Sequence, residues 1–271
     1  LISLPFTETC PPLIDPAADV EPEEFARQLA AERTRRGLPL EVRAELPAAV
    51  GAAVSKTFVT HRLALDPDVA VVQGRFAKGQ VKRGIAKARR EGVSIERRTD
   101  ADGLRRFYRL HVATRRRQGL PTQSKRFILR FSELFDRGLG FVLLARQDGR
   151  DVASGVFLTA GGTLTYEFGA SDPRFLGSRP NNLLLMDAIV WACETGHHTL
   201  DFGRTNPDNH GLRAFKCSWG AEESLLRYSH LGPGPGRDAM ERGRSTLSLA
   251  IRRAPEPFGR LVGSALYRHL G

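Results

Sequence analysis

Apolar residues recur at helical spacing in several stretches of the chain. Within residues 101–118, Leu104, Phe107, Tyr108 and His111 stand at positions i, i+3, i+4 and i+7, which predicts an amphipathic helix. In residues 21–36 the same spacing is followed by Gly37, a residue typical of helix ends. Further helices are expected over residues 75–90, 124–136, 181–195 and 210–217, and over 247–251 and 261–266 near the end of the chain.

Shorter stretches show the alternating pattern of strands. Strands expected over residues 141–146, 152–158 and 164–168 are separated by Gln147-Asp148-Gly149 and Ala160-Gly161-Gly162, which predicts an antiparallel meander with tight turns. Helices and strands in mixed order indicate an α/β (α+β) fold. The other expected strands cover residues 38–46, 56–65, 93–98, 200–202 and 226–229.

The positive charge of the chain is concentrated in one segment. The 271 residues carry 41 Lys and Arg against 30 Asp and Glu, a net charge of +11. Residues 75–130 contain 18 of these basic residues and only four acidic ones. Such a block favours binding of a polyanion through phosphate contacts. Candidates are RNA, a nucleotide, an anionic lipid surface or a phosphorylated sugar carrier, and the alternative is a set of solvated helix faces.

Other features of the composition exclude several classes of protein. Cys10, Cys193 and Cys217 are too few and too widely spaced for a disulfide framework or a zinc knuckle, so we expect a reducing, cytoplasmic location. No His, Cys, Asp and Glu grouping repeats at metal-ligand spacing, and we expect no metal. No apolar run approaches the length of a transmembrane helix. The chain begins at Leu1 without Met, so we expect a preceding native segment.

Four groups of short motifs stand out along the chain. They are Ser3–Phe6 with Cys10–Leu13, Phe107–His111 with Thr114–Arg116, Ser178–Leu184, and Asp201–Thr205 with Gly211–Ala221. Together these motifs resemble the Fem-type (FemAB-like) branch of the GNAT superfamily, and the likeness extends to about Leu231. The resemblance implies two GNAT-like lobes with mixed, mainly antiparallel sheets. The expected ranges are a truncated N-terminal lobe over 1–99, a C-terminal lobe over 100–231, and a Gly/Pro-rich linker with a helical tail over 232–271.

The resemblance also implies an activity. Fem-type enzymes transfer an amino acid from aminoacyl-tRNA to an amine of a peptidoglycan precursor. We therefore expect an acyltransferase with aminoacyl-tRNA as co-substrate, no bound cofactor, and tRNA and an amine-bearing acceptor as partners, with peripheral contact to an anionic surface also open. The alternatives are an acyl-CoA-dependent N-acetyltransferase and a noncatalytic protein that binds RNA or an anionic surface.

Acyl transfer needs a donor for the oxyanion and a base for the attacking amine. Lys216 is the candidate oxyanion donor because aromatic neighbours strengthen its field, and the resemblance implicates the Phe215-Lys216 pair. The alternative for Lys216 is a surface lysine. Asp201 ends an expected strand and is either the base or amine-orienting group, or a structural carboxylate. Tyr166 and Glu167 are expected to line the acceptor site.

Other residues are candidates for binding phosphate. Arg204 suits an anion, although it could instead pair with Asp201. Enzymes that use acetyl-CoA have a glycine-rich loop before the corresponding helix. Here Gly177 is the only glycine before the helix that begins at Asn181. The lack of such a loop favours aminoacyl-tRNA over acyl-CoA as the donor. Asn181 is alternatively a helix cap. We expect the basic segment on one side of the cleft between the lobes. The remaining candidates are Arg179, Asn182, Lys82, Arg83, Arg115 and Arg116.

Overall fold

The computed structural model describes residues 2–3, 7–13, 15, 17, 21–47, 50–232, 247–253 and 256–269. The expected Gly/Pro-rich linker from residue 233 to residue 246, and residues 4–6 of the first motif, lie outside these ranges. The strands are β1 (Leu40–Val42), β2 (Ala53–Ala64), β3 (Ser94–Arg98), β4 (Gly140–Gln147), β5 (Arg150–Ala160), β6 (Thr163–Ser171), β7 (Thr199–Thr205) and β8 (Glu222–Leu231). The helices are α1 (Pro22–Arg36), α2 (Val69–Gly74), η2 (Lys78–Lys82), α3 (Arg83–Arg90), α4 (Ala101–Gln118), α5 (Lys125–Leu129), α6 (Phe131–Phe135), η3 (Pro173–Ser178), α7 (Pro180–Glu194), α8 (His210–Ser218) and α10 (Glu256–His269).

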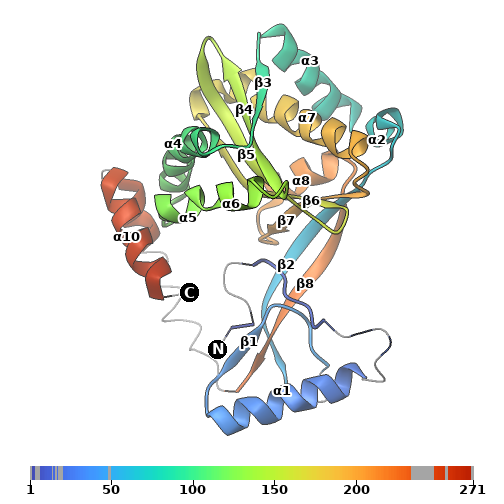
Figure 1. The fold of residues 1–271 in the computed structure, drawn as a ribbon, viewed down its shortest axis with the longest axis vertical. Helices are drawn as coiled ribbons and strands as arrows, with labels where there is room; N and C mark the ends of the chain where they lie inside the picture. The colour runs from blue at the N-terminus through green and yellow to red at the C-terminus, as the bar shows by residue number, and fades with distance from the viewer. Residues whose placement is uncertain are drawn as a thin grey trace.

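The strands form one eight-stranded sheet in the order β1-β8-β2-β7-β6-β5-β4-β3 (Figure 1). Strands β6 and β7 are parallel and every other neighbouring pair is antiparallel. The expected mixed and mainly antiparallel α/β fold is confirmed. The expected domain boundary after residue 99 falls inside the sheet, because β3 pairs with β4 across it. Residues 75–99 therefore pack with the second half of the chain.

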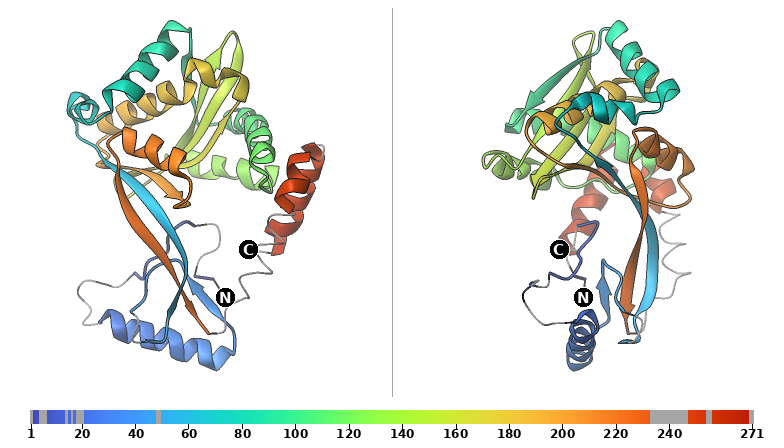
Figure 2. Two further views of the ribbon diagram at one scale, coloured as in Figure 1. Left: turned by 180° about the vertical axis from the view of Figure 1, so that it is seen from behind. Right: turned by 90° about the vertical axis from the view of Figure 1, so that its right-hand side faces the viewer.

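Helices cover both faces of the sheet (Figures 1 and 2). Alternate residues of β4 point to opposite faces, with Leu143 in one apolar cluster and Leu144 in the other. The first cluster contains buried residues of α2, α3 and α7, together with Trp219. The second cluster contains buried residues of α4, α5 and α6. Helices α3 and α4 thus lie on opposite faces of the sheet.

Strands β2 and β8 are long, and they carry the chain to a third apolar cluster near α1 (Figure 2). The N-terminal segment is attached to β1 in this region. Ser3 N–H donates to the Glu41 carbonyl at 2.9 Å, and Cys10 N–H donates to the Arg43 carbonyl at 3.0 Å. Residues 7–10 are therefore held beside the sheet. The third cluster consists of Ala26, Val42, Ala44, Leu46 and Leu231.

The ends of the helices follow local chemistry where the sequence is clear. Helix α4 spans the predicted residues because Asp100 accepts a hydrogen bond from Gly103 N–H at 2.9 Å and Gly119 adopts φ 71° after the last turn. The helix predicted over 75–90 is wrong at its start. Helix α2 ends at Gly74, and Ala77 N–H donates to the Ser218 carbonyl at 2.8 Å, so a tertiary contact replaces the helical bond there.

None of the helices in the described ranges has both the length and the apolar character needed to cross a bilayer.

Candidate active site

The parallel strands β6 and β7 separate in the middle of the sheet. Their pairing covers Thr163–Thr165 of β6 and Thr199–Asp201 of β7. Beyond that point β6 pairs with β5, and β7 pairs with β2. Both strands continue after their shared pairing ends. The residues that follow Thr165 and Asp201 therefore border a gap in the hydrogen-bonded sheet. This gap is called the strand separation below.

Each of the two strands carries a β-bulge at the strand separation. In β6, Tyr166 pairs with Phe157 and Phe168 with Val156, which leaves Glu167 as the extra residue. In β7, two residues, Phe202 and Gly203, stand opposite the single residue His61 of β2. A bulge changes the direction of the side chains next to it. Both bulges thus interrupt the simple alternation of side-chain directions beside the strand separation.

The bulge in β7 is fixed by hydrogen bonds. Gly203 adopts φ 70°, a left-handed conformation that suits glycine. The Asp201 carboxylate accepts a hydrogen bond from Gly203 N–H at 2.7 Å. The Lys216 ammonium donates to the carbonyl oxygens of Gly203 at 2.8 Å and Arg204 at 3.4 Å. Lys216 is buried, with 5% of its surface exposed, so the alternative of a surface lysine is wrong.

Glu8 joins these residues from the N-terminal segment. Its carboxylate accepts a hydrogen bond from the backbone N–H of Arg204, and its carbonyl accepts one from the Tyr228 hydroxyl. A Cβ atom at residue 203 would lie only 2.5 Å from Glu8 Oε2, so any larger residue there would displace the Glu8 carboxylate. Sequence reasoning missed Glu8. The available signal was its place between the two N-terminal motifs that carried the resemblance.

At the strand separation, Glu167 and Lys216 are each within electrostatic reach of the same two carboxyl groups, Glu8 and Asp201. Burial, followed by the charges of Glu8 and Asp201, raises the pKa of Glu167 to about 7. Burial also raises the pKa of Glu8, against the lowering effect of the hydrogen bond from the Arg204 backbone. Burial lowers the pKa of Lys216 to about 8, although Glu8 and Asp201 oppose the shift. Glu167 can therefore take up or release a proton near neutral pH.

Asp201 and Arg204 make separate contacts. The Asp201 carboxylate accepts a hydrogen bond from Arg62 Nε at 3.1 Å. The Arg204 guanidinium lies 4.4 Å from the centre of the Phe58 ring and donates to the Tyr228 hydroxyl at 2.6 Å. Asp201 thus pairs with Arg62, whereas Arg204 holds Tyr228 beside Glu8. Both residues support the strand separation from β7.

The other aromatic candidates belong mainly to the core. The Tyr166 ring stacks on Phe157 with 5.0 Å between ring centres, and burial raises the pKa of Tyr166 to about 12. Phe215 is half-buried and packs edge-on to Trp219, which is fully buried. Among the predicted residues of α8 and β6, Lys216 and Glu167 are therefore the ones that reach the charged cluster.

The start of α7 differs from a simple phosphate-binding helix terminus. The helix begins at Pro180, one residue before the expected start, and Arg179 precedes it with φ 60°. Arg179 is exposed and Asn181 is half-buried. Asn182 is buried, and its side chain packs against Gly84 of α3. Arg179 is thus the predicted phosphate-binding residue that faces solvent here, while Asn182 joins two helices.

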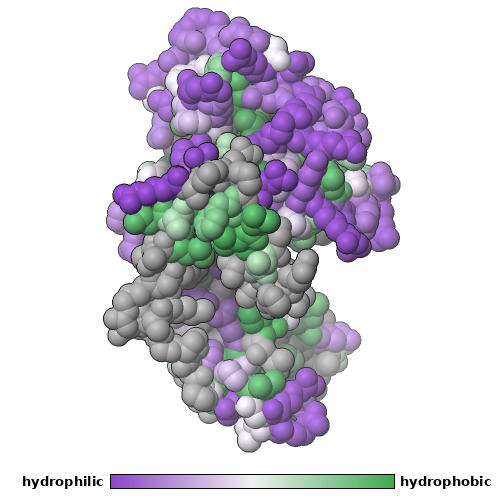
Figure 3. Space-filling view, turned by 90° about the vertical axis from the view of Figure 1, so that its left-hand side faces the viewer, coloured by the Kyte–Doolittle hydropathy of each residue, from purple (hydrophilic) through white to green (hydrophobic). Residues whose placement is uncertain are grey.

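The basic segment does not form one surface. Lys82 and Arg83 are exposed at the start of α3, whereas Arg115 and Arg116 are half-buried on α4, on the other face of the sheet. The expectation of a single basic side is therefore wrong, because the sheet divides the segment. Figure 3 shows the face that carries α10, where an apolar area lies between hydrophilic regions.

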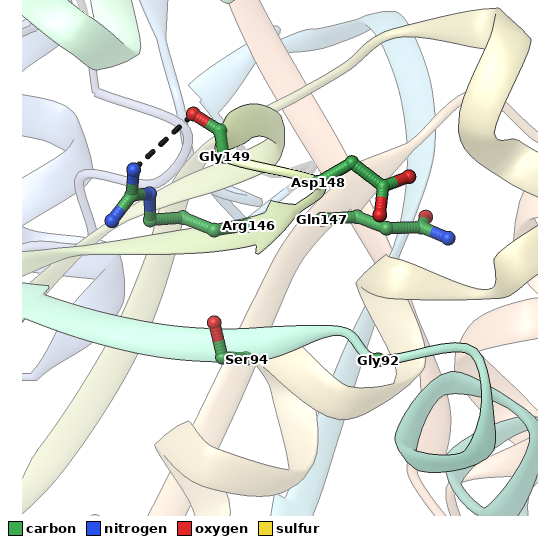
Figure 4. Close-up of a pocket in the computed structure, with 6 residues that line it drawn as sticks. All are labelled: Gly92, Ser94, Arg146, Gln147, Asp148 and Gly149. Atoms are coloured by element: carbon green, nitrogen blue, oxygen red, sulfur yellow. Dashed lines mark hydrogen bonds between the residues drawn. The ribbon is translucent and has the colours of Figure 1, made fainter.

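A hollow of about 180 Å³ lies at the turn between β4 and β5, away from β7. It is formed where the start of β3 meets the turn between β4 and β5, and none of the predicted site residues lines it (Figure 4). Within this hollow, Arg146 donates a hydrogen bond to the Gly149 carbonyl at 3.2 Å, so the side chain is engaged by its own turn. The candidate active site is the strand separation.

Comparisons with known proteins agree with this geometry. The solved structure of FemX matches with a TM-score of 0.60 and 17% identity, covering 77% of this chain and 76% of FemX. The C-terminal DUF2156 domain of a protein named as a lysylphosphatidylglycerol synthetase from Agrobacterium fabrum matches with a TM-score of 0.56 and 14% identity, covering 83% and 77%. A tandem GNAT protein of the clavulanic acid biosynthesis pathway, solved without AcCoA, matches with a TM-score of 0.50 and 15% identity, covering 83% and 74%.

These structural matches establish a shared fold, including the Fem-like arrangement that the motifs indicated. A search of curated proteins finds no match. The sequence model of the acetyltransferase (GNAT) domain matches residues 75–216, a span of 142 residues that is more than half of the 271. This span includes the strand separation and Lys216, and the chain accordingly belongs to the acetyltransferase (GNAT) domain family and is an acyltransferase.

Proposed function

We propose that this acyltransferase moves an aminoacyl group from aminoacyl-tRNA to an amine of a peptide or peptidoglycan precursor, and that the reaction takes place at the strand separation in the cytoplasm. The observation that carries the proposal is the Glu167 carboxyl, whose pKa is raised to about 7 by burial and by the charges of Glu8 and Asp201, the two carboxylates that also act on Lys216. An amine attacks a carbonyl only after it loses its proton, and a base with a pKa near the working pH is suited to remove it.

In the proposed reaction the amine nitrogen attacks the ester carbonyl of the aminoacyl-tRNA. Glu167 takes the proton from the amine as the new C–N bond forms, and it returns that proton to the leaving tRNA oxygen as the ester C–O bond breaks. An ammonium has three N–H donors. Lys216 directs two of them at the carbonyl oxygens of Gly203 and Arg204, which leaves one for the developing oxyanion.

Three observations support aminoacyl-tRNA as the donor. The Fem-type resemblance implies it, and the name of the matching lysylphosphatidylglycerol synthetase describes joining of a lysyl group to an acceptor. The start of α7 has no glycine-rich loop, since Pro180 and the αL residue Arg179 occupy that place. Helix α3 contacts both η3 and α7. Exposed Lys82, at the end of η2, and exposed Arg83, at the start of α3, therefore place positive charge on the side of the sheet that carries the start of α7.

The donor is tested by incubating the protein with total aminoacylated tRNA, or with a panel of acyl-CoA esters, together with amine acceptors. We expect loss of the aminoacyl ester and formation of an amide in the first mixture. Release of free thiol from an acyl-CoA, with no consumption of aminoacyl-tRNA, would contradict the proposed donor.

The tRNA contact is tested by its dependence on salt. We expect the double variant Lys82→Ser/Arg83→Ser to weaken tRNA binding and to make the log-log salt slope shallower by roughly 1.4 to 1.8, about 0.7 to 0.9 for each lost phosphate contact. Arg105→Ser/Arg109→Ser removes two exposed charges from α4 and is the matched control. Equal effects of the two double variants would contradict a contact on the α3 side.

An acyl-CoA-dependent N-acetyltransferase is the second candidate. The observation that favours it is the match to the acetyltransferase (GNAT) domain family, together with the fold shared with the tandem GNAT protein that was solved without AcCoA. Glu167 would serve the same role with a thioester donor. Binding of desulfo-CoA in the micromolar range, with a shallow salt dependence, would favour this candidate.

A further inference from the structure

Three side chains with metal-binding atoms meet beside α8. His61 of β2 stands directly opposite Glu223 of β8 in the sheet register, and Cys217 of α8 approaches them. The potential ligand atoms of the three residues all lie within 4.8 Å of one another. The three positions are far apart in sequence, so local spacing gave no sign of the group and no metal was expected.

The imidazole of His61 is incompletely paired. His61 is fully buried, and among the described residues its Nδ1 atom has no hydrogen-bonding partner. Its Nε2 atom lies 3.0 Å from Glu223 Oε2 and interacts with that carboxylate, although the direction of the contact is poor for a hydrogen bond. Buried polar groups almost always have well-formed hydrogen bonds. A metal ion between the imidazole and the carboxylate would satisfy both groups.

The combination of donors selects the ion. Imidazole nitrogen, thiolate sulfur and carboxylate oxygen together suit Zn²⁺, which binds four ligands in a tetrahedron. With bond lengths of about 2.0 to 2.3 Å, two ligands of a tetrahedral zinc lie roughly 3.3 to 3.7 Å apart. The 3.0 Å contact of His61 with Glu223 is close to that separation. Cys217 is exposed, and rotation of its side chain can shorten the longer separations.

Arg213 fixes the carboxylate of this group. Its Nε and Nη2 atoms donate to the two oxygens of Glu223 at 2.8 and 2.7 Å, and its Nη1 donates to the Pro207 carbonyl at 2.8 Å. Each carboxylate oxygen has a second lone pair, so Glu223 can bind a metal while it accepts these bonds. Carboxylates that bind metals are commonly held by such outer hydrogen bonds. The negative charges of Glu223 and of a Cys217 thiolate offset the positive charge of the Arg213 guanidinium.

We propose that His61, Cys217 and Glu223 bind a zinc ion, with water as the fourth ligand on the exposed side. The ion fastens α8 to β2 and β8, and so holds the helix that carries Lys216 against the sheet. This inference is independent of the donor in the acyl transfer.

The site is tested with the full chain, stripped of metal by a chelator and titrated with Co²⁺ under reducing conditions. We expect one equivalent to produce the thiolate-to-cobalt charge-transfer absorption and the visible bands of tetrahedral cobalt, and Zn²⁺ to remove them. The melting temperature should rise with Zn²⁺. Absence of a cobalt spectrum at micromolar protein and metal would overturn the proposal.

Variants assign the ligands without relying on the buried histidine, whose replacement endangers folding. Cys217→Ser should abolish the charge-transfer band, and Glu223→Gln should weaken Zn²⁺ binding roughly 10- to 100-fold. Cys10→Ser and Glu222→Gln are the matched controls and should leave the spectrum and the affinity unchanged. A band that persists in Cys217→Ser, or is lost in Cys10→Ser, would place the metal elsewhere and overturn the assignment.

Discussion

At the scale of single residues, Glu167 is the group whose protonation matters most for the chemistry. Its pKa is raised to about 7, so the basic form dominates only above that pH. We expect the rate to fall as pH drops through about 7. Glu167→Gln should lower kcat by roughly 10²- to 10⁴-fold and remove this dependence. The measurement is a profile of kcat/KM against pH, and an unchanged profile in the variant would exclude Glu167 as the base.

The same shift affects stability, with the opposite preference for pH. A carboxyl whose pKa rises from 4.5 in the unfolded chain to about 7 in the folded protein binds its proton more tightly when folded. Its contribution is therefore fully present below pH 4.5 and is lost as pH rises to 7. The Glu167→Gln variant retains Glu8 and Asp201, whose charges raise this pKa, but it lacks the carboxylate that they repel. Above pH 7 we expect Glu167→Gln to be more stable than the parent, by on the order of 2 to 3 kcal/mol, measured by urea unfolding.

Lys216 combines a structural and a chemical role. Replacement by Met leaves the Gly203 and Arg204 carbonyls without their donor, which should cost about 1 to 3 kcal/mol in unfolding free energy. Turnover per folded molecule should fall by roughly 10²- to 10³-fold if the ammonium stabilises the oxyanion. Urea titration and single-turnover rates separate the two effects. A rate that declines only with the folded fraction would leave Lys216 as a positioning residue.

At the scale of elements, the bulge in β7 should control the position of Glu8. Gly203→Ala places a Cβ against the Glu8 carboxylate and also strains a residue with φ 70°. Gly161→Ala, at φ 53° in the turn between β5 and β6, has the strain with no atom within 4 Å of the added Cβ. We expect both variants to lose about 1 kcal/mol or more of stability. Only Gly203→Ala should also lose turnover, and equal turnover in the two would show that the Glu8 contact is dispensable.

At the scale of the whole molecule, the third apolar cluster should open independently of the rest. None of its residues belongs to either of the two clusters that cover the faces of the sheet around β4. Leu231→Ala removes a buried side chain from it, and we expect faster hydrogen exchange in α1 and β1 with unchanged exchange in β4 and β5. The control is Leu225→Ala on the same strand, which is 61% exposed. Uniformly faster exchange would show that the molecule unfolds as one unit.

This cluster also connects the fold to the site. The segment that carries Glu8 is bonded to the residue that follows β1, through the Cys10 N–H and the Arg43 carbonyl. Loosening of β1 should therefore release Glu8 from the strand separation. We expect Leu231→Ala to lower turnover even though residue 231 is remote from Glu167.

The sequence by itself determined the features that depend on near neighbours. Helix α4 was predicted with its bounds because periodic apolar residues, the Asp100 cap and Gly119 all lie within one stretch of chain. The meander followed from short alternating runs and turns rich in glycine, and the GNAT-type fold followed from motifs read in order. Lys216, Asp201 and Glu167 were named because each lies at a recognisable place on its own element.

Only the tertiary structure decided which of these elements meet. Residues such as Thr60 and Ser224, 164 positions apart, come into contact when β2 pairs with β8, and no local pattern specifies that register. Glu8 reaches Gly203, and His61 reaches Glu223 and Cys217, through such pairings. The basic segment was continuous in sequence but is divided by the sheet, because α3 and α4 pack on opposite faces. Spacing along the chain sets the period of a helix or strand, whereas the pairing of distant strands sets the chemistry between them.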